Sequence, residues 1–346
     1  MKMNNTRNDN DINLEDGLSS AIINMRALAC FAVILIHASI IYSPTEWWAN
    51  NFYGVIPRFA VPFFFMISGV LLINKSYTPL MFFTKRLPRV VLPLIAWSII
   101  YYIWKQDDYK SIANFSKQFV TFPIYYHLWF LYSMIGVYLS AIVLIPFYNN
   151  SSHAEKLCFL ALWITTNFLY PTAMGISESK NNLIDIYNLH VFYGMSGWFF
   201  LGAYLRDIKK PSCKIKTAHA LVIFISIVLM LTLTYWSSKR MSPSGIPFEI
   251  SEIFRGLNSP LTLTYSVSLF MLLLNIRNNK LSTIIARNSL GIYCLHIIVL
   301  SLTITATSEF NISKWVSIPL IAFITLTACT LIIDVIRRFP YMKWFT

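Results

Sequence analysis

The sequence predicts an all-helical integral membrane protein with about ten transmembrane helices and both termini in the cytoplasm. Three observations carry this expectation: the chain is 56% hydrophobic, it is only 12% charged, and long apolar runs recur along its 346 residues. A soluble domain normally carries about twice that charged fraction. A single soluble core cannot hide so much apolar surface, so most of it is expected to face lipid.

Apolar runs of a length suited to a hydrocarbon core of about 30 Å recur from residue 21 onward. We expect transmembrane helices at 21–41, 57–73, 90–104, 128–147, 157–170, 191–205, 218–236, 260–274, 281–304 and 315–336. The segment before them, residues 1–20, is rich in Asn and Asp and is expected to be a disordered cytoplasmic tail. Residues 21–346 are expected to form a single transmembrane domain.

The distribution of basic residues sets the orientation, because short cytoplasmic loops are enriched in Lys and Arg. Both terminal segments and the second, sixth and eighth loops are basic, whereas the first and fifth loops are nearly free of positive charge. The basic residues are Lys2, Arg7, Lys75, Lys85, Arg86, Lys209, Lys210, Lys214, Lys216, Arg277, Lys280, Arg337, Arg338 and Lys343. Lys105, Lys110, Lys117, Lys239, Arg240 and Arg255, in the third and seventh loops, dilute this asymmetry. An even number of spans with both ends inside fits best.

Most of the net charge of +13 is explained by this orientation, so nucleic acid is not an expected partner. Membrane lipids are the expected partners instead. The five cysteines are scattered without a CxxC pair, so neither a disulfide framework nor a metal site is expected. No Walker A, GxGxxG or HExxH motif is present, and no permanently bound cofactor is expected.

The first predicted span contains two basic side chains, Arg26 and His37, eleven residues apart. Ionisable residues inside a membrane helix are costly and point to function. Eleven residues are three helical turns plus about 20°, so both side chains leave one face, about 16 Å apart along the axis. A neutral imidazole at the depth of His37 can accept a proton from an alcohol near neutral pH.

Each of these two residues also has a structural interpretation. Arg26 can extend its side chain to cytoplasmic headgroups, and His37 can hydrogen-bond to a neighbouring helix. The first span alone leaves both interpretations open.

Several motifs in order along the chain resemble the acyltransferase-3 family of membrane acyltransferases, which includes bacterial surface-polysaccharide O-acetyltransferases such as the enterobacterial common antigen type. The Arg26–His37 spacing resembles the family's signature on its first span. Residues 61–69 (VPFFFMISG) resemble its second span, 85–89 (KRLPR) its cytoplasmic R-x-x-R loop, 127–131 (HLWFL) the entry into its fourth span, and 291–296 (GIYCLH) a late helix.

The resemblance implies an O-acyltransferase of the bacterial cytoplasmic membrane that moves an acetyl group from acyl-CoA to a cell-surface or lipid-linked glycan. In this interpretation His37 is the catalytic general base and Arg26 positions the donor, acetyl-CoA. Arg86 and Arg89 would pair with the phosphates of CoA, since guanidinium groups bind phosphate bidentately. Simple topological anchoring is the alternative for these two arginines.

Four further residues are candidates for binding the acceptor: Arg58, His127, Trp129 and Tyr293. Arg58 suits an acidic sugar or a pyrophosphate, and equally an outer headgroup. Aromatic residues such as Trp129 stack on sugars but also form ordinary interfacial belts. Tyr293 lies one turn from His296 on the same helix face, and for this pair packing is favoured over lining a cavity.

Two other functions remain open at this point: succinyl transfer to an exported polysaccharide, and non-enzymatic transport or flipping of a lipid-linked sugar. Transporters tend to have paired Gly/Pro-broken helices in inverted halves. The chain has only 11 glycines and no such pairing, which favours the enzyme.

Overall fold

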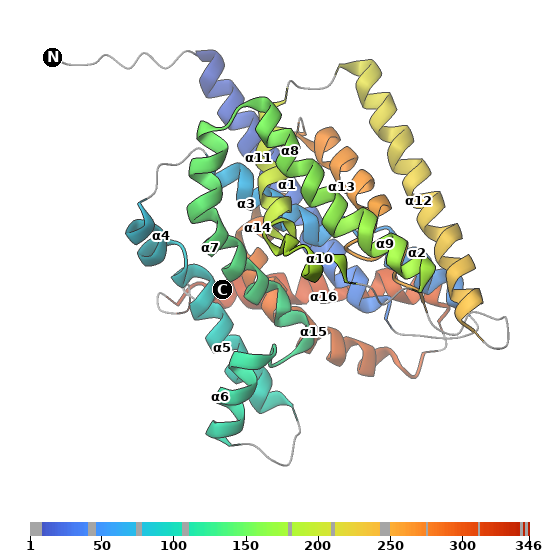
Figure 1. The fold of residues 1–346 in the computed structure, drawn as a ribbon. Helices are drawn as coiled ribbons and strands as arrows, with labels where there is room; N and C mark the ends of the chain where they lie inside the picture. Colours follow the sequence, from blue (N-terminus) through green and yellow to red (C-terminus); the bar gives the residue numbers. More distant parts are fainter. Residues whose placement is uncertain are drawn as a thin grey trace. The chain divides into compact units, whose positions relative to one another are not determined.

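The computed structural model describes residues 9–40, 46–73, 78–105, 111–178, 182–208, 212–242, 250–274, 276–310, 312–339, 342 and 345–346. In these residues the regular structure is entirely helical (Figure 1). The helices are α1 Asp9–Ala38, α2 Trp47–Val55, α3 Ala60–Leu72, α4 Pro79–Lys85, α5 Pro88–Trp104, α6 Ile112–Thr121, α7 Trp129–Asn150, α8 His153–Ile164, α9 Tyr170–Ser177, α10 Leu183–Ile186, α11 Ser196–Asp207, α12 Cys213–Met241, α13 Pro260–Leu273, α14 Lys280–Arg287, α15 Ser289–Thr307 and α16 Lys314–Ile336. Lys2, Arg7, Lys75, Lys110, Lys209, Lys210 and Lys343 lie outside the described residues.

Seven helical segments of the described chain are long and apolar enough to cross a membrane. They are Gly17–Ala38, Trp47–Leu72, Tyr126–Asn150, His153–Ser177, Cys213–Met241, Ser289–Thr307 and Lys314–Ile336. Two shorter apolar helices, α5 and α13, have 17 and 14 residues. The multi-pass helical architecture is therefore confirmed, while the count of ten spans and the cytoplasmic termini remain predictions.

The span expected at 191–205 differs from the prediction. The helix there, α11, has 12 residues, a rise of about 18 Å, which is short of the hydrocarbon core. Gly194, just before it, has a φ of 113°, and its N–H donates to Asn167 Oδ1 at 2.8 Å. This left-handed backbone, which glycine adopts without steric cost, keeps α11 from extending toward its N-terminus.

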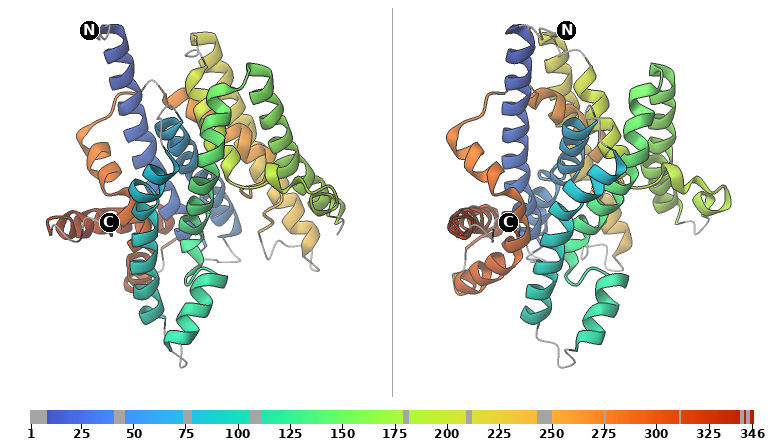
Figure 2. Two further views of the ribbon diagram at one scale, coloured as in Figure 1. Left: turned by 60° about the vertical axis from the view of Figure 1, so that its left-hand side comes forward. Right: turned by 90° about the vertical axis from the view of Figure 1, so that its left-hand side faces the viewer.

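Two other boundaries also differ from expectation. The segment expected as one helix at 281–304 breaks at Asn288 into α14, with charged residues Lys280 and Arg287, and the apolar α15. At the other end of the chain α1 begins at Asp9, so residues 9–20 of the expected disordered tail are helical (Figure 2). Once an apolar helix has nucleated, adding residues to its end is cheap, because each new residue gains one hydrogen bond.

The chain divides into two compact units, which we describe separately. The first comprises residues 1–64, 208–289 and 303–326, and the second comprises 65–207, 290–302 and 327–346. In the first unit α12 packs along α13, and α1 packs against α14 and α2. The amide of Asn24 on α1 donates to the carbonyl oxygens of Ile276 at 3.1 Å and Arg277 at 2.8 Å, which joins α1 to the chain that leads into α14.

In the second unit two glycines allow α3 and α11 to approach closely. A Cβ atom on Gly69 would lie 1.8 Å from the carbonyl oxygen of Phe199, and one on Gly202 would lie 2.2 Å from that of Met66. Membrane helices associate through small residues of this kind, because lipid gives no hydrophobic drive for apolar side chains to meet. Gly69 therefore has a packing role.

We expect Gly69→Ala to lower the unfolding temperature of the protein purified in detergent, because the added methyl group forces α3 and α11 apart. Overpacking of this kind costs about 1–3 kcal/mol. Gly136→Ala on α7 is the matched control, since a Cβ there meets nothing within 4 Å. Equal unfolding temperatures for the two variants would contradict the close-packing role of Gly69.

Candidate functional site

Arg26 and His37 lie on one unbroken helix, α1, which contains no proline. The helical spacing predicted from the sequence therefore holds: the two side chains share a face, about 16 Å apart along the axis. Both are partly buried. Arg26 lies in the middle of α1, where its charge acts on Cys30 one turn further on, and His37 lies in the last turn.

The surroundings of His37 belong to the first unit, where α1 meets α2 and α13. The charge of Arg58, at the break between α2 and α3, acts on His37. Sequence reasoning treated Arg58 as a separate acceptor candidate, and the structure brings it into electrostatic range of the predicted base.

Arg58 forms a two-pronged ion pair with Glu252, a residue of the loop before α13. Nη2 of Arg58 donates to Glu252 Oε1 at 2.9 Å, and Nη1 lies 2.8 Å from Oε2. The third donor, Nε, is bound to the carbonyl oxygen of Gly54 at 2.7 Å. Such fork-to-fork pairs are among the strongest hydrogen-bonded contacts in proteins and fix the orientation of both groups.

Arg255 shares the same carboxylate. Its Nη2 and Nε atoms donate to Glu252 Oε1 at 2.8 and 3.0 Å. The three side chains differ in exposure: Arg255 is 9% exposed, Arg58 16% and Glu252 53%. The two guanidinium groups are thus enclosed by protein, while the carboxylate between them lies at the open edge of the cluster.

The backbone around this ionic cluster is held by specific contacts. A Cβ on Gly54 would lie 2.4 Å from Arg255 Nη1, so a glycine on α2 makes room for that guanidinium. The hydroxyl of Tyr265 on α13 donates to the carbonyl oxygen of Ile56 at 2.7 Å, where the break between α2 and α3 begins. Thr262 Oγ1 donates to the Arg255 carbonyl oxygen at 3.3 Å.

The charges of the cluster alter the acidity of its members. Desolvation raises the pKa of Glu252, but the positive charges of Arg58 and Arg255 lower it more, so the net shift is downward. Burial, together with the repulsion from Arg58, lowers the pKa of Arg255 to about 10, against the pull of Glu252. Glu252 and Arg255 therefore both remain charged at neutral pH.

A second polar cluster lies in the second unit and is made of histidine and tyrosine side chains. His127 and His296 are 1% and 0% exposed, and their ring centroids lie 5.3 Å apart at an interplanar angle of 88°. The hydroxyl of Tyr293 donates to the backbone carbonyl oxygen of His127, and that of Tyr101 donates to the carbonyl oxygen of Cys294 at 2.8 Å. The cluster joins α5, α15 and the short turn before α7.

This burial bears on two of the acceptor candidates. His127 and Tyr293 are brought together, as their shared prediction requires, but both are enclosed and the Tyr293 hydroxyl is already engaged. Trp129, at the start of α7, is partly buried. Acceptor binding by these three residues stays a prediction, and it would require the aromatic cluster to open.

The candidate donor residues Arg86 and Arg89 lie at the junction of α4 and α5, in the second unit. Arg86 follows the last residue of α4 and is partly buried, whereas Arg89 is exposed in the first turn of α5. The two arginines are three residues apart, which is about one helical turn of chain.

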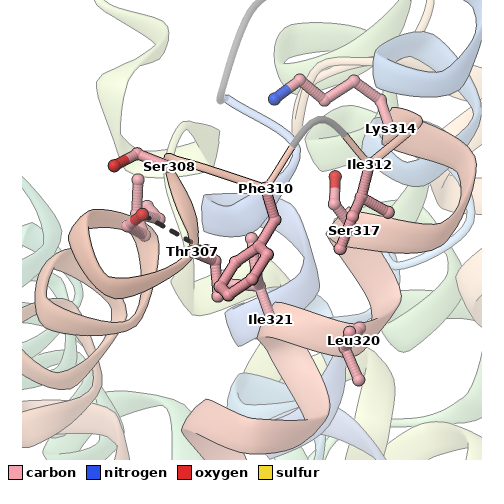
Figure 3. A pocket seen from close by; sticks show the side chains of 9 residues that line it. Thr307, Ser308, Phe310, Ile312, Lys314, Ser317, Leu320 and Ile321 are labelled. Carbon is pink, nitrogen blue, oxygen red and sulfur yellow. Dashed lines mark hydrogen bonds between the residues drawn. The ribbon is translucent and has the colours of Figure 1, made fainter.

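The first unit also contains a small cavity of about 180 Å³ between the end of α15 and the start of α16 (Figure 3). Phe310 and Ile321 line it with Lys314 and Ser317. Thr307 at its edge donates to the carbonyl oxygens of Thr303 and Ile304 at 2.8 and 3.2 Å. The cavity is smaller than typical ligand pockets, which hold about 300–1,000 Å³, so we do not assign it a substrate. In the described residues no three His, Cys, Asp or Glu side chains gather as a metal site.

Sequence reasoning missed Glu252 and took Arg255 only as a charge that dilutes the topology signal. Their spacing of three residues, with Ile253 and Phe254 between them, was the available signal. A charged pair among apolar residues in a short connection indicates a packed loop rather than a solvated one.

The sequence profile of a family described as "Acyltransferase domain" matches residues 19–334. The match covers nearly the whole chain, and the chain belongs to this family of membrane acyltransferases. It is also similar to an amino-acid racemase of Enterococcus faecalis, with 29% identity over 208 residues. That match covers 54% of this chain and 28% of the racemase, so the chain spans well under two thirds of that relative's length. No solved structure matches it.

The lowered pKa of Glu252 predicts a pH-dependent stability. A carboxylate with a depressed folded-state pKa stabilises the fold above its unfolded pKa, about 4.3, and loses this contribution as the pH falls through the folded-state value. We expect Glu252→Gln to lower the unfolding temperature at pH 6–7 and to match the unaltered protein only once the pH has fallen through the lowered folded-state pKa, where the carboxylate becomes protonated. The exposed Glu309→Gln variant is the control. A difference that stays constant with pH would contradict the prediction.

Proposed function

We propose that this chain is an O-acyltransferase of the bacterial cytoplasmic membrane that transfers an acetyl group from cytoplasmic acetyl-CoA to a hydroxyl of a cell-surface or lipid-linked glycan. The observation that carries the proposal is the pair of polar side chains, Arg26 and His37, on one face of α1 in a chain that belongs to a membrane acyltransferase family. A helix of this kind carries such residues for function rather than for stability.

In the proposed reaction the imidazole of His37 takes the proton of the acceptor hydroxyl. The hydroxyl oxygen attacks the thioester carbonyl carbon, a new C–O bond forms and the C–S bond breaks. The departing CoA thiolate takes the proton back from the imidazolium. A neutral imidazole suits the first step because it can accept a proton, and the imidazolium that it becomes suits the second step because it can donate one. An acyl-histidine intermediate is the alternative route.

The donor is proposed to bind through arginines. Arg26 would position the pantetheine arm or a phosphate on α1, and Arg86 and Arg89 would hold the phosphates of CoA. Their partly or fully exposed side chains within one turn of chain support this assignment. Racemisation, the activity in the name of the Enterococcus faecalis relative, is not proposed, since the match covers 28% of that protein.

We expect His37→Ala to lower the rate of acetyl transfer by about 10²–10⁴-fold, the usual worth of a general base. Binding of acetyl-CoA should stay nearly intact, because the base acts in the chemical step. Arg26→Ala should instead weaken donor binding. Transfer to total surface glycan, with donor affinity measured on purified protein, tests both variants. His153→Ala, at an exposed histidine, is the control. Near-normal transfer by a folded His37→Ala protein would overturn the mechanism.

For the donor site we expect the double variant Arg86→Ala, Arg89→Ala to bind acetyl-CoA at least about tenfold more weakly. Each charge-assisted contact is worth about 1.5–3 kcal/mol. Lysine at both positions should restore affinity only in part, because the bidentate fork is lost. The neighbouring exposed Lys85→Ala variant controls for loss of charge alone. Unchanged donor affinity in the double variant would reduce the two arginines to topological anchors.

A further inference from the structure

The ionic cluster of Arg58, Arg255 and Glu252 is unbalanced in charge. Two guanidinium groups share one carboxylate, and both approach the same oxygen, Oε1, at 2.9 and 2.8 Å. Among the described residues of the cluster the sum of charges is +1. Buried excess charge is costly unless a counter-charge or hydrogen bonds compensate for it.

Two buried polar groups, one on Arg255 and one on Asn50 of α2, also indicate that the cluster lacks a binding partner among the described residues. Nη1 of Arg255 is buried and has no hydrogen-bond partner among the described residues. On α2, Asn50 is 1% exposed, and neither atom of its amide is hydrogen-bonded within the described part of the chain. Asn50 lies four residues before Gly54, on the same face of the helix that admits the guanidinium of Arg255. The site thus has hydrogen-bonding capacity that the described residues do not use.

The carboxylate that holds the two arginines is the most exchangeable member of the cluster. Glu252 is 53% exposed, whereas the arginines are 9% and 16% exposed. A carboxylate or phosphate arriving from the open edge presents the same oxygen geometry to the guanidinium groups as Glu252 does.

We propose that Arg58 and Arg255 form an oxyanion-binding site for an acidic group of the acceptor, a carboxylate or a phosphate, and that Glu252 is a resident carboxylate which this group displaces. The assignment to the acceptor rests on the proposed function. The charge of Arg58 acts on His37, so an anion bound there lies near the predicted base. Arg26, the predicted donor residue, lies about 16 Å from His37 along α1.

The proposal makes opposite predictions for the two charge types in the cluster. We expect the full chain, purified in detergent, to bind glucuronate or inorganic pyrophosphate more tightly than glucose, as measured by calorimetry. Arg255→Ala should weaken this binding about tenfold or more, and Arg255→Lys should weaken it less. Glu252→Gln should strengthen it, because the competing carboxylate is gone. A purely structural salt bridge predicts no gain of affinity in Glu252→Gln.

Two variants control the experiment. Arg240→Ala removes an exposed arginine of the same unit, near the ring of Trp236, and should leave anion binding unchanged. Glu249 lies outside the described residues, and Glu249→Gln tests whether it supplies the missing negative charge. If Glu249→Gln strengthens anion binding and Glu252→Gln does not, the cluster is neutralised within the chain and the proposal is wrong.

The choice of probe identifies the source of the anion. Tighter binding of glucuronate supports an acidic sugar, and tighter binding of pyrophosphate supports a lipid-linked diphosphate. If Arg255→Ala weakens only the binding of adenosine 3′,5′-bisphosphate, the site belongs to the donor and the proposal is overturned. Anion binding that needs Arg255 in a protein without acetyl transfer would remove the proposed function and leave the anion site. Acetyl transfer by a protein that binds none of these anions would support the proposed function and overturn the anion site.

Discussion

A polar group of this chain that leaves water needs a hydrogen-bond partner in the protein or on a bound ligand, because hydrocarbon offers none. For the backbone this requirement selects helices. For the side chains it has a second consequence: charged groups that lie away from water must collect where they can satisfy one another. The pairing of Arg58 with Glu252 meets this requirement at the break between α2 and α3, with the Tyr265 hydroxyl on the Ile56 carbonyl oxygen beside it. An interrupted helix is tolerated there because its freed polar groups are satisfied by the loop and by α13.

The two polar clusters differ in what they can do chemically. The cluster of the first unit is charged, has an open edge at Glu252 and acts electrostatically on His37. The aromatic cluster of the second unit is enclosed, and its tyrosine hydroxyls are bound to backbone carbonyl oxygens. A charged substrate group is bound by counter-charges that the protein already holds in place. Because these side chains are ordered before the substrate arrives, less conformational entropy is lost on binding. For these reasons the first cluster is the stronger candidate for substrate recognition, and the second suits a packing role.

Close packing supports these sites in both units. Gly69 and Gly202 bring α3 against α11, and Gly54 admits the guanidinium of Arg255. In each case glycine is needed because it has no side chain: a single methyl group would lie 2.4 Å or less from an oxygen or nitrogen atom. A chain with few glycines therefore uses several of them where helices, or a helix and a charged side chain, meet most closely.

The sequence alone determined the membrane class, the helical architecture, the resemblance to the acyltransferase family and the common face of Arg26 and His37. These properties depend on composition and on helical periodicity, both of which are local. It did not determine that α11 is a short helix that begins only after the left-handed backbone of Gly194. Nor did it determine that the predicted helix at 281–304 breaks at Asn288. It also did not reveal that Arg58, Glu252 and Arg255 form one cluster. Arg58 and Glu252 are 194 residues apart, and only tertiary packing brings such residues together, because a contact between distant residues leaves no periodic trace in either segment.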